Sequence, residues 1–317
     1  MKLLICTQAV DVGDSDLGFF VRWIEEFAKQ CEKVTVVCLH KGEYSLPNNV
    51  EVCVLGNAPR FVRTLRLWRI CIARCREYDA VFVHMNPEFI VAAGLLWRIL
   101  RKRVALWYTH KSVNLKLRIA VLLVHIVFTA SKESFRLRSK KVRVVGHGID
   151  TDFFSFDANA VRGDFLLSVG RLMPSKRHDL AIRAAAFVDR ELRIIGEGPE
   201  RENLEALVHA LDARVRFLGG LTQPQLRDEY QKAAYLIHTS ETGSLDKVVL
   251  EALACGLPVV TISTVLTGIP VIVASATPGA LAEKILTAHQ SDTQSLVAYV
   301  REHHSLQHLI PAILYTI

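Results

Sequence analysis

The feature that most constrains the fold of this chain is a regular alternation between short apolar runs and longer amphipathic stretches. Short apolar runs between segments of helical length are typical of βα units that build a parallel sheet. The series begins near residue 3 and starts again near residue 165, where a run leads into its own glycine-containing turn. We therefore expect an α/β protein with two doubly wound parallel sheets.

The predicted boundaries follow this alternation. In the first series the strands are residues 3–6, 34–39, 50–55, 80–84, 104–107, 126–129 and 142–145, and the helices are 17–31, 61–76, 87–100, 115–123 and 131–138. The second series has strands 165–169, 192–195, 215–218, 235–238 and 258–260, with helices 176–188, 199–211, 223–233 and 246–254. These elements predict Rossmann-like domains at residues 1–155 and 156–300, and a C-terminal helix at 301–317 that packs back toward the first domain.

Charge is distributed unevenly between the two predicted domains. Residues 1–155 hold 24 Lys and Arg against 14 Asp and Glu, whereas the remainder holds 15 against 18. A basic half suits a phosphorylated substrate, an anionic membrane or nucleic acid. The sequence contains no RNA-binding module, zinc finger or strip of stacking aromatic residues, so we expect no nucleic-acid partner.

The cysteines and apolar segments bear on location. The seven cysteines are odd in number and include no Cys-x-x-Cys pair, which predicts reduced thiols in a cytoplasmic protein. The N-terminus lacks the long apolar stretch of a signal peptide. Residues 119–130 are too short to span a bilayer, and residues 252–282 are broken by proline and glycine, so we expect no membrane span.

Basic residues follow the first strand of the second series. Gly170 and Arg171 come directly after that strand, and Lys176 opens the next predicted helix. The carboxyl ends of strands form the ligand crevice of a doubly wound sheet, so Arg171 and Lys176 are placed to pair with a diphosphate. Ordinary solvated charge is the alternative. A glycine turn with Glu197 and Gly198 follows the next strand and fits either close approach to a nucleotide or a structural βα turn.

The longest motif is TSETGSLDKVVLEALACGLPVV, at residues 239–260. A loop of small polar residues leaves a predicted strand and enters a helix, whose first amides and positive dipole end suit an anion. Glu251 lies about two turns inside this helix, where a carboxylate can pair with ribose hydroxyls. A capped surface helix is the alternative interpretation.

The order of these motifs resembles that of the family 4 glycosyltransferases, which have the GT-B fold. SVGRL with its following SK, then IIGEGPE, VRFLGG and SETGSLDKVVLEALACGLPVV, occur in the family's order, and VVGHGIDTDFF is similar to the segment entering its interdomain linker. The resemblance covers nearly the whole chain. It implies two Rossmann-like domains with a cleft between them. It also implies a retaining, metal-independent transfer of sugar from a UDP-, GDP- or ADP-sugar to a hydroxyl acceptor, with no cofactor.

The resemblance also implies roles for residues. Arg171 and Lys176 would hold the donor diphosphate and stabilise it as it leaves. Glu251 matches the second glutamate of the family's E-x7-E motif and would contact the ribose. The first glutamate falls at position 243, which is Gly243 here, so the usual carboxylate against the donor sugar is missing.

This departure leaves alternatives open. Glu241 and Asp246 are the candidates to replace the missing carboxylate, while Gly243, Ser244 and Lys247 offer further donor contacts from the same loop. The region 261–276 is also shorter than the family's glycine-rich loop and strand. A catalytically impaired sugar-nucleotide-binding protein is therefore one alternative, and an epimerase of the same fold, which needs no acceptor, is another.

Three further candidates lie in the first domain. His110 follows a strand in the neighbourhood where the family has a histidine that reaches the donor, and we count it with the catalytic residues. His84 ends the preceding strand and Gly18 lies in the first βα loop, so both are acceptor-side candidates. For each histidine a structural role is the alternative. The Asp-x-Asp pairs at 14–16 and 150–152 precede a helix and open a linker, respectively, so we expect no metal site.

The helix predicted at 61–76 is amphipathic. Five arginines fall on one side of its helical wheel, and the other side carries Phe61, Leu65, Trp68, Ile72 and Cys75. The wheel favours packing of this apolar side on the sheet. The alternative is that the helix lies on an anionic bilayer, at the inner face of the plasma membrane, which would suit a lipid-linked acceptor. A sugar or another hydroxyl acceptor, and a role in envelope glycan or glycolipid synthesis, are implied by the resemblance.

Overall fold

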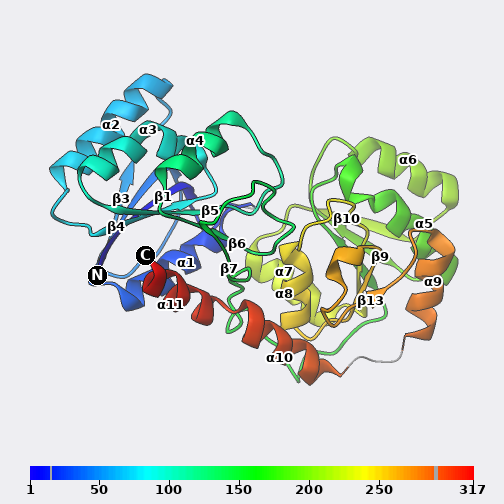
Figure 1. Ribbon diagram of the computed structural model, residues 1–317. Helices are drawn as coiled ribbons and strands as arrows, with labels where there is room; N and C mark the ends of the chain where they lie inside the picture. Colours follow the sequence, from blue (N-terminus) through cyan, green and yellow to red (C-terminus); the bar gives the residue numbers. More distant parts are fainter. Residues whose placement is uncertain (15, 289–291) are drawn as a thin grey trace. The chain divides into compact units, whose positions relative to one another are not determined.

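The computed structural model describes residues 1–14, 16–288 and 292–317, which form two compact units (Figure 1). The first unit consists of Met1–Gly148 and Leu306–Ile317, and the second of Ile149–Ser305. The division follows Gly148 rather than residue 155, because Ile149 and Phe154 are buried in the core of the second unit. That unit extends past residue 300, because the helix that contributes Val300 to its core continues to residue 304.

The first unit contains a seven-stranded parallel sheet with the order β3-β2-β1-β4-β5-β6-β7. Its strands are β1 (Lys2–Val10), β2 (Lys33–Lys41), β3 (Val50–Val54), β4 (Ala80–His84), β5 (Arg103–Trp107), β6 (Ile126–Thr129) and β7 (Val142–Val144). The strand order changes direction between β1 and β4. The carboxyl ends of these two strands therefore flank the switch point at which doubly wound sheets bind ligands.

Helices cover both faces of this sheet. The first face carries α1 (Phe19–Gln30) and α11 (Leu306–Thr316), and the second carries α2 (Arg60–Ala73), α3 (Pro87–Ile99) and α4 (Leu115–Leu123). Asn86 and Asn114 begin α3 and α4 by accepting hydrogen bonds from helical amides. Leu309 and Ile313 of α11 are buried with residues of α1 and the sheet, so the C-terminal helix completes the core of the first unit.

The second unit contains a six-stranded parallel sheet with the order β10-β9-β8-β11-β12-β13. Its strands are β8 (Leu166–Val169), β9 (Leu192–Ile195), β10 (Val215–Gly219), β11 (Tyr235–His238), β12 (Val259–Thr261) and β13 (Ile272–Val273). Its helices are η1 (Pro174–Lys176), α5 (His178–Val188), α6 (Arg201–Leu211), α7 (Gln223–Lys232), α8 (Lys247–Ala254), η2 (Thr264–Leu266), α9 (Pro278–Thr287) and α10 (Thr293–His304). The order changes direction between β8 and β11. The prediction of two doubly wound α/β domains is confirmed.

The helix predicted at residues 131–138 is wrong, because this segment forms turns and bends. Ser131 Oγ lies 2.9 Å from Ser134 Oγ and accepts a hydrogen bond from the Ser134 amide at 3.3 Å. Such local bonds between side chain and backbone compete with helical hydrogen bonds. Phe135 then turns into the core beneath α2, α3 and α4.

The packing of α2 also differs from the prediction. Leu67 and Cys71 are the buried residues of this helix, and they lie on a different stripe from the apolar side of the wheel. That apolar side faces solvent, with exposed fractions of 72% for Phe61, 46% for Leu65, 42% for Trp68 and 53% for Ile72. A row of exposed apolar side chains on a folded domain marks an interaction surface.

The cysteines and the lengths of the helices bear on the location of the protein. All seven cysteines are free thiols, and five are buried. Burial raises the pKa of Cys38 and of Cys71 to about 11, so both stay protonated at neutral pH. None of the helices within the described residues is long and apolar enough to cross a membrane.

Candidate functional site

Two loops at the carboxyl edge of the second sheet bring several predicted donor residues together. One loop, residues 170–177, follows β8, and the other, residues 239–246, follows β11. β8 and β11 are neighbours in the sheet, so the loops begin side by side at its switch point. The Thr239 hydroxyl donates a hydrogen bond to the Lys176 carbonyl at 2.9 Å and ties the loops to each other.

A chain of polar groups connects Lys176 to the edge of the sheet. Lys176 Nζ lies 2.5 Å from Asp246 Oδ2, and the same oxygen lies 3.1 Å from His238 Nε2. The other ring nitrogen, His238 Nδ1, lies 2.9 Å from Thr261 Oγ1 on β12. His238 is the last residue of β11 and is buried, so its ring fixes the Asp246 carboxylate against the sheet.

The neighbours of Asp246 keep its carboxylate ionised. Burial by itself would raise the pKa of Asp246, but the hydrogen bond with His238 and the positive charge of Lys176 outweigh burial and hold this pKa well below its usual value. The Lys176 side chain is 23% exposed and the Asp246 side chain 13%. The site therefore presents an ammonium group, at the more accessible end of the chain, that can exchange its carboxylate partner for another anion.

Small polar side chains surround Asp246 in the second loop. Thr242 Oγ1 lies 2.9 Å from Ser240 Oγ and 3.2 Å from Ser244 Oγ, and Ser244 Oγ lies 3.3 Å from Asp246 Oδ1. Gly243 has a φ of +58°, in the left-handed region that favours glycine. A glutamate at this position would be strained in a loop of this shape.

Glu241, the other candidate to replace the missing carboxylate, is engaged by a different cation. It forms an ion pair with Arg177, whose φ of +53° places it in the left-handed region. This conformation interrupts the helix, so α5 begins at His178 rather than at Lys176 as predicted. Lys176 is consequently the last residue of η1, ahead of α5, and its side chain reaches Asp246.

Arg171 is exposed, and within the described residues its guanidinium has no hydrogen-bond or ion-pair partner. A guanidinium with free donors in a planar fork matches the oxygen atoms of a phosphate group. An anion that enters this edge of the sheet would therefore meet Arg171 unpaired and Lys176 paired with Asp246.

The glycine turn after β9 is required by close packing of two loops. A Cβ atom on Gly196 would lie 2.0 Å from the Gly170 carbonyl oxygen, and one on Gly198 would lie 2.4 Å from the Leu172 carbonyl oxygen. The Leu172 amide also donates to the Glu197 carbonyl at 2.9 Å, while the residue Glu197 is exposed. These contacts fit the structural interpretation of this turn.

Glu251 is 3% exposed and belongs to the interior of the second unit. Its Oε1 lies 3.5 Å from Lys247 Nζ, one turn earlier in α8, and the Tyr230 hydroxyl donates to its Oε2 at 3.4 Å. Burial, followed by the charge of Glu251, raises the pKa of Tyr230. Lys247, predicted as a separate donor contact, therefore pairs with Glu251.

Sequence reasoning missed two histidines at this edge, His238 and His178. A polar residue at the end of an apolar strand was the available signal for His238. His178 is 3% exposed, its Nδ1 lies 2.8 Å from Ser168 Oγ, and its Nε2 has no hydrogen-bond partner among the described residues.

His178 gives a testable pH dependence of stability. Burial lowers its pKa to about 4, whereas an unfolded histidine titrates near 6.5. Between these values the unfolded chain binds more protons, so stability is lost as the pH falls. We expect this group to lower the free energy of unfolding by about 2 kcal/mol between pH 7 and pH 5. Urea unfolding of His178→Gln should show a correspondingly flatter pH profile, and a profile as steep as the wild type would contradict the prediction.

His84 lies in the first unit, at the end of β4. Its ring stacks on Phe20 with centroids 3.9 Å apart, and its Nδ1 lies 3.4 Å from Thr7 Oγ1. The residue is 2% exposed, and these contacts fit the structural alternative.

His110 and Gly18 occupy loops of the first unit. His110 is exposed, and its Nδ1 accepts a hydrogen bond from the Ser112 amide at 3.0 Å. A Cβ atom on Gly18 would lie 2.6 Å from the Asp14 carbonyl oxygen, so the tight turn before α1 requires glycine there. Among the predicted site residues, Lys176 and Ser244 both contact Asp246 in the second unit, whereas His84, His110 and Gly18 belong to the first unit.

The two Asp-x-Asp pairs serve local turns. Asp14 Oδ1 accepts a hydrogen bond from the Asp16 amide at 2.9 Å, and Asp150 Oδ1 accepts one from the Asp152 amide at 3.2 Å. Within residues 1–14, 16–288 and 292–317, no group of three or more His, Cys, Asp or Glu side chains is arranged to hold a metal ion.

Comparison with known families identifies a match in the second unit. Residues 150–302 match the model of the family described as glycosyl transferases group 1. Over 174 residues the chain is 33% identical to the D-inositol 3-phosphate glycosyltransferase of Mycolicibacterium smegmatis, covering 50% of this chain and 40% of that protein. Over 148 residues it is 30% identical to the gpi3 subunit of the phosphatidylinositol N-acetylglucosaminyltransferase of Schizosaccharomyces pombe, covering 44% and 32%. The matched segment spans less than half the length of these relatives.

Solved structures resemble the whole chain. Anabaena HepE in complex with UDP-glucose has a TM-score of 0.78 at 17% identity and covers 100% of both chains. Sucrose-phosphate synthase from Thermosynechococcus elongatus has a TM-score of 0.75 at 15% identity and covers 100% of this chain and 98% of its own. At these identities the likeness establishes the fold, which is the two-domain GT-B fold.

Proposed function

We propose that this chain, whose residues 150–302 match the glycosyl transferases group 1 family, transfers a sugar from a nucleoside diphosphate sugar to a hydroxyl acceptor. The observation that carries the proposal is the Lys176–Asp246 pair at the switch point of the second sheet, with the unpaired Arg171 on the same loop as Lys176. Cations together with the amides at the start of a helix would bind a diphosphate, and this edge of the sheet carries Arg171, Lys176 and the start of α8.

The donor would occupy the loops after β8 and β11. Arg171 and Lys176 would bind the diphosphate, together with the first amides of α8, whose positive dipole end lies after the Gly243–Ser244 loop. Glu251 would face the ribose. Because Glu251 is buried beside Lys247, this contact requires the ribose to enter against the start of α8.

Asp246 would replace the carboxylate that is missing at Gly243. Its Oδ2 already contacts Lys176, whereas Glu241 pairs with Arg177. When a diphosphate takes over Lys176, the Asp246 carboxylate is released to accept hydrogen bonds from the sugar hydroxyls. His238 would hold it in place during this exchange.

The proposed chemistry is a displacement on one face of the sugar. The bond from the anomeric carbon to the β-phosphate oxygen breaks, and its electron pair goes to the diphosphate. The acceptor oxygen forms its bond to the same face, and its proton passes to the departing phosphate oxygen. Arg171, Lys176 and the α8 amides stabilise the charge that grows on the diphosphate. His110, exposed on the first unit, is the candidate for a further contact with the donor.

We expect transfer to be independent of divalent metal ions, because Arg171 and Lys176 would carry the charge stabilisation that a bound cation supplies in other enzymes. Initial rates measured with excess EDTA should equal those measured without it. A loss of activity that Mg²⁺ or Mn²⁺ restores would contradict this prediction.

The proposed function is tested by a thermal-shift screen against UDP-, GDP- and ADP-sugars, followed by product analysis with the donor that stabilises the chain. We expect the sugar nucleotides of one of the three bases to raise the melting temperature of the protein. Product should form only with a hydroxyl acceptor and should keep the donor's anomeric configuration by NMR. A product formed without acceptor would indicate the epimerase instead. Stabilisation by a donor without any product would indicate the impaired binding protein, and inverted product would contradict retention.

The location and acceptor form part of the proposal. The chain would act in the cytoplasm, at the inner face of the plasma membrane, on a glycan or glycolipid acceptor of the cell envelope. The free thiols support a reducing compartment. The exposed apolar row of α2, with arginines beside it, supports contact with an anionic bilayer.

Membrane contact is tested by sedimentation with vesicles of phosphatidylcholine and phosphatidylglycerol. Replacing both Phe61 and Ile72 with serine should weaken binding by about 10²-fold, because two large apolar side chains no longer enter the bilayer. Leu286→Ser, at a residue of the second unit that is 62% exposed, is the matched control and should bind like the wild type. Equal binding by all three proteins would contradict the proposal.

A further inference from the structure

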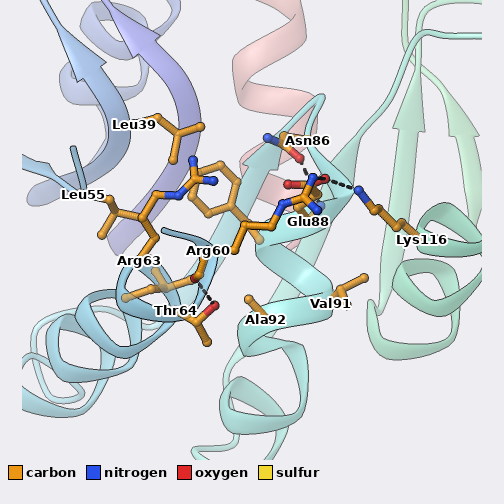
Figure 2. Close-up of a pocket in the computed structure, with 12 residues that line it drawn as sticks. Leu39, Leu55, Arg60, Arg63, Thr64, Asn86, Glu88, Val91, Ala92 and Lys116 are labelled. Carbon is orange, nitrogen blue, oxygen red and sulfur yellow. Dashed lines mark hydrogen bonds and ion pairs between the residues drawn. The ribbon is translucent and has the colours of Figure 1, made fainter. Parts of the chain in front are cut away.

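A pocket of about 240 Å³ opens in the first unit, between α2 and α3 (Figure 2). It lies at the carboxyl edge of the sheet, because its lining includes Leu39 near the end of β2 and Asn86 two residues after β4. Its volume is below the roughly 300–1,000 Å³ of sites for drug-sized ligands. The pocket therefore suits a head group or a single ring.

The charge of this pocket is predominantly positive. Arg60, Arg63 and Lys116 line it, against one carboxylate, Glu88, among its described lining residues. Arg60 Nη2 lies 3.5 Å from Glu88 Oε1, and Lys116 forms an ion pair with the same oxygen. The hydrogen bond from Lys116 holds the pKa of Glu88 below its usual value, against the effect of burial. With Glu88 ionised, the pocket keeps a surplus of two positive charges.

Arg63 is the third cation of this pocket, and no ion pair joins it to Glu88. The Arg63 backbone amide donates to the Pro59 carbonyl at 3.0 Å. Among the described residues none accepts a hydrogen bond from the Arg63 guanidinium or forms an ion pair with it, and its Nε is shielded from solvent without a partner. Figure 2 shows its side chain extending past Leu55 toward Leu39, whereas Arg60 turns toward Glu88. A shielded donor without an acceptor is unfavourable, so a ligand oxygen at this point would gain from both charge and hydrogen bonding.

A second polar group has donor capacity to spare. Asn86 Oδ1 accepts a hydrogen bond from the Glu88 amide at 3.0 Å, which leaves the Asn86 amide nitrogen to donate. Together with the Glu88 carboxylate, it offers one donor and one acceptor for hydroxyl groups. Apolar side chains complete the inner wall, namely Leu39, Leu55, Leu67 and Phe89.

We propose that this pocket binds a phosphate ester group of the acceptor, with the Arg63 guanidinium on the phosphate oxygens and Glu88 and Asn86 on the neighbouring hydroxyls. A phosphomonoester carries about −1.5 to −2 charge at neutral pH and so matches the surplus of two positive charges better than a carboxylate does. This inference rests on the proposed function, and it assigns the class of acceptor: a phosphorylated polyol or sugar, free or as the head group of a lipid.

The inference is tested on the full chain with sn-glycerol 3-phosphate as the probe and glycerol as its uncharged match, by titration calorimetry. We expect the phosphate ester to bind and glycerol not to bind. Arg63→Gln should weaken binding by roughly tenfold or more, because charge-assisted hydrogen bonds are lost. Arg63→Lys keeps the charge without the planar fork and should fall between the two. Arg69→Gln, at an exposed arginine of the same helix, is the matched control and should bind like the wild type.

Two further experiments complete the test. The first distinguishes a lipid phosphate from a free one, and the second tests the proposed function separately from the pocket. Vesicles of phosphatidylcholine with phosphatidic acid test a lipid head group against vesicles of phosphatidylcholine. Sensitivity to Arg63→Gln confined to the phosphatidic acid vesicles still supports the inference and assigns a lipid source. Equal binding by Arg63→Gln and Arg69→Gln to both probes would overturn it. UDP titrated into the same proteins should bind independently of Arg63, and failure of nucleotide binding beside intact phosphate binding would count against the proposed function and not against the pocket.

Discussion

Replacing Lys176 with alanine is expected to lower the kcat of sugar transfer by about 10²–10³-fold. The departing diphosphate would lose an ammonium group at the point where its negative charge grows, in a site that is partly shielded from water. The measurement is steady-state kinetics at saturating donor, with thermal unfolding to show that the fold survives. Asp246 keeps its contact with His238 in this variant, which limits the loss of stability.

Two controls accompany Lys176→Ala. Lys176→Arg keeps a positive charge on a longer side chain and should retain part of the activity. Lys232→Ala removes an exposed lysine of α7 and should leave kcat unchanged. Wild-type activity in Lys176→Ala would remove Lys176 from the mechanism.

Asp246→Asn is expected to destabilise the second unit by about 2 kcal/mol at pH 7, less than a fully buried pair would lose because Lys176 and Asp246 retain some exposure. Burial opposes the Asp246 charge, but His238 and Lys176 outweigh it and lower the pKa of the folded carboxyl. A depressed carboxyl pKa stabilises the fold above the unfolded value near 3.9. That contribution is lost as the pH falls toward the folded value. The gap between wild type and variant should therefore be complete at neutral pH and narrow below about pH 4.

A double-mutant cycle of Lys176→Ala and Asp246→Asn measures the interaction itself, by urea unfolding at pH 7. The two single changes should cost more stability in sum than the double change does, because either one already breaks the pair. Strict additivity, or a gap that stays constant down to pH 3, would show that the pair does not stabilise the fold.

Most strands were predictable because they are short, apolar and bounded by turn residues, whereas the two-residue strand β13 (Ile272–Val273) was not predicted. The strands at 80–84, 126–129, 192–195 and 235–238 have the predicted limits. The predicted helix at 131–138 was wrong because its serines bond locally. The predicted packing of α2 was wrong for a different reason. A helical wheel identifies the most apolar side of a helix, but it does not show which side contacts the core, and α2 packs through Leu67 and Cys71 instead.

The candidate site was predictable in its residue types and less so in its contacts. Arg171, Lys176 and Glu251 follow from motif order. The pairing of Lys176 with Asp246 joins residues from two different βα loops and depends on the left-handed Arg177, a conformation that a non-glycine residue rarely signals. His238 was missed because a single polar residue at the end of a strand is weak evidence before the neighbouring loop is placed.

A nucleotide-sugar donor site on the second unit is tested by titration calorimetry of the wild type and Arg171→Ala with UDP, GDP and ADP. We expect one of the three nucleotides to bind the wild type, and Arg171→Ala to weaken this binding by about tenfold, because a guanidinium without a protein partner is the group that the diphosphate would engage. Failure of all three to bind, or equal affinity in both proteins, would contradict this donor site.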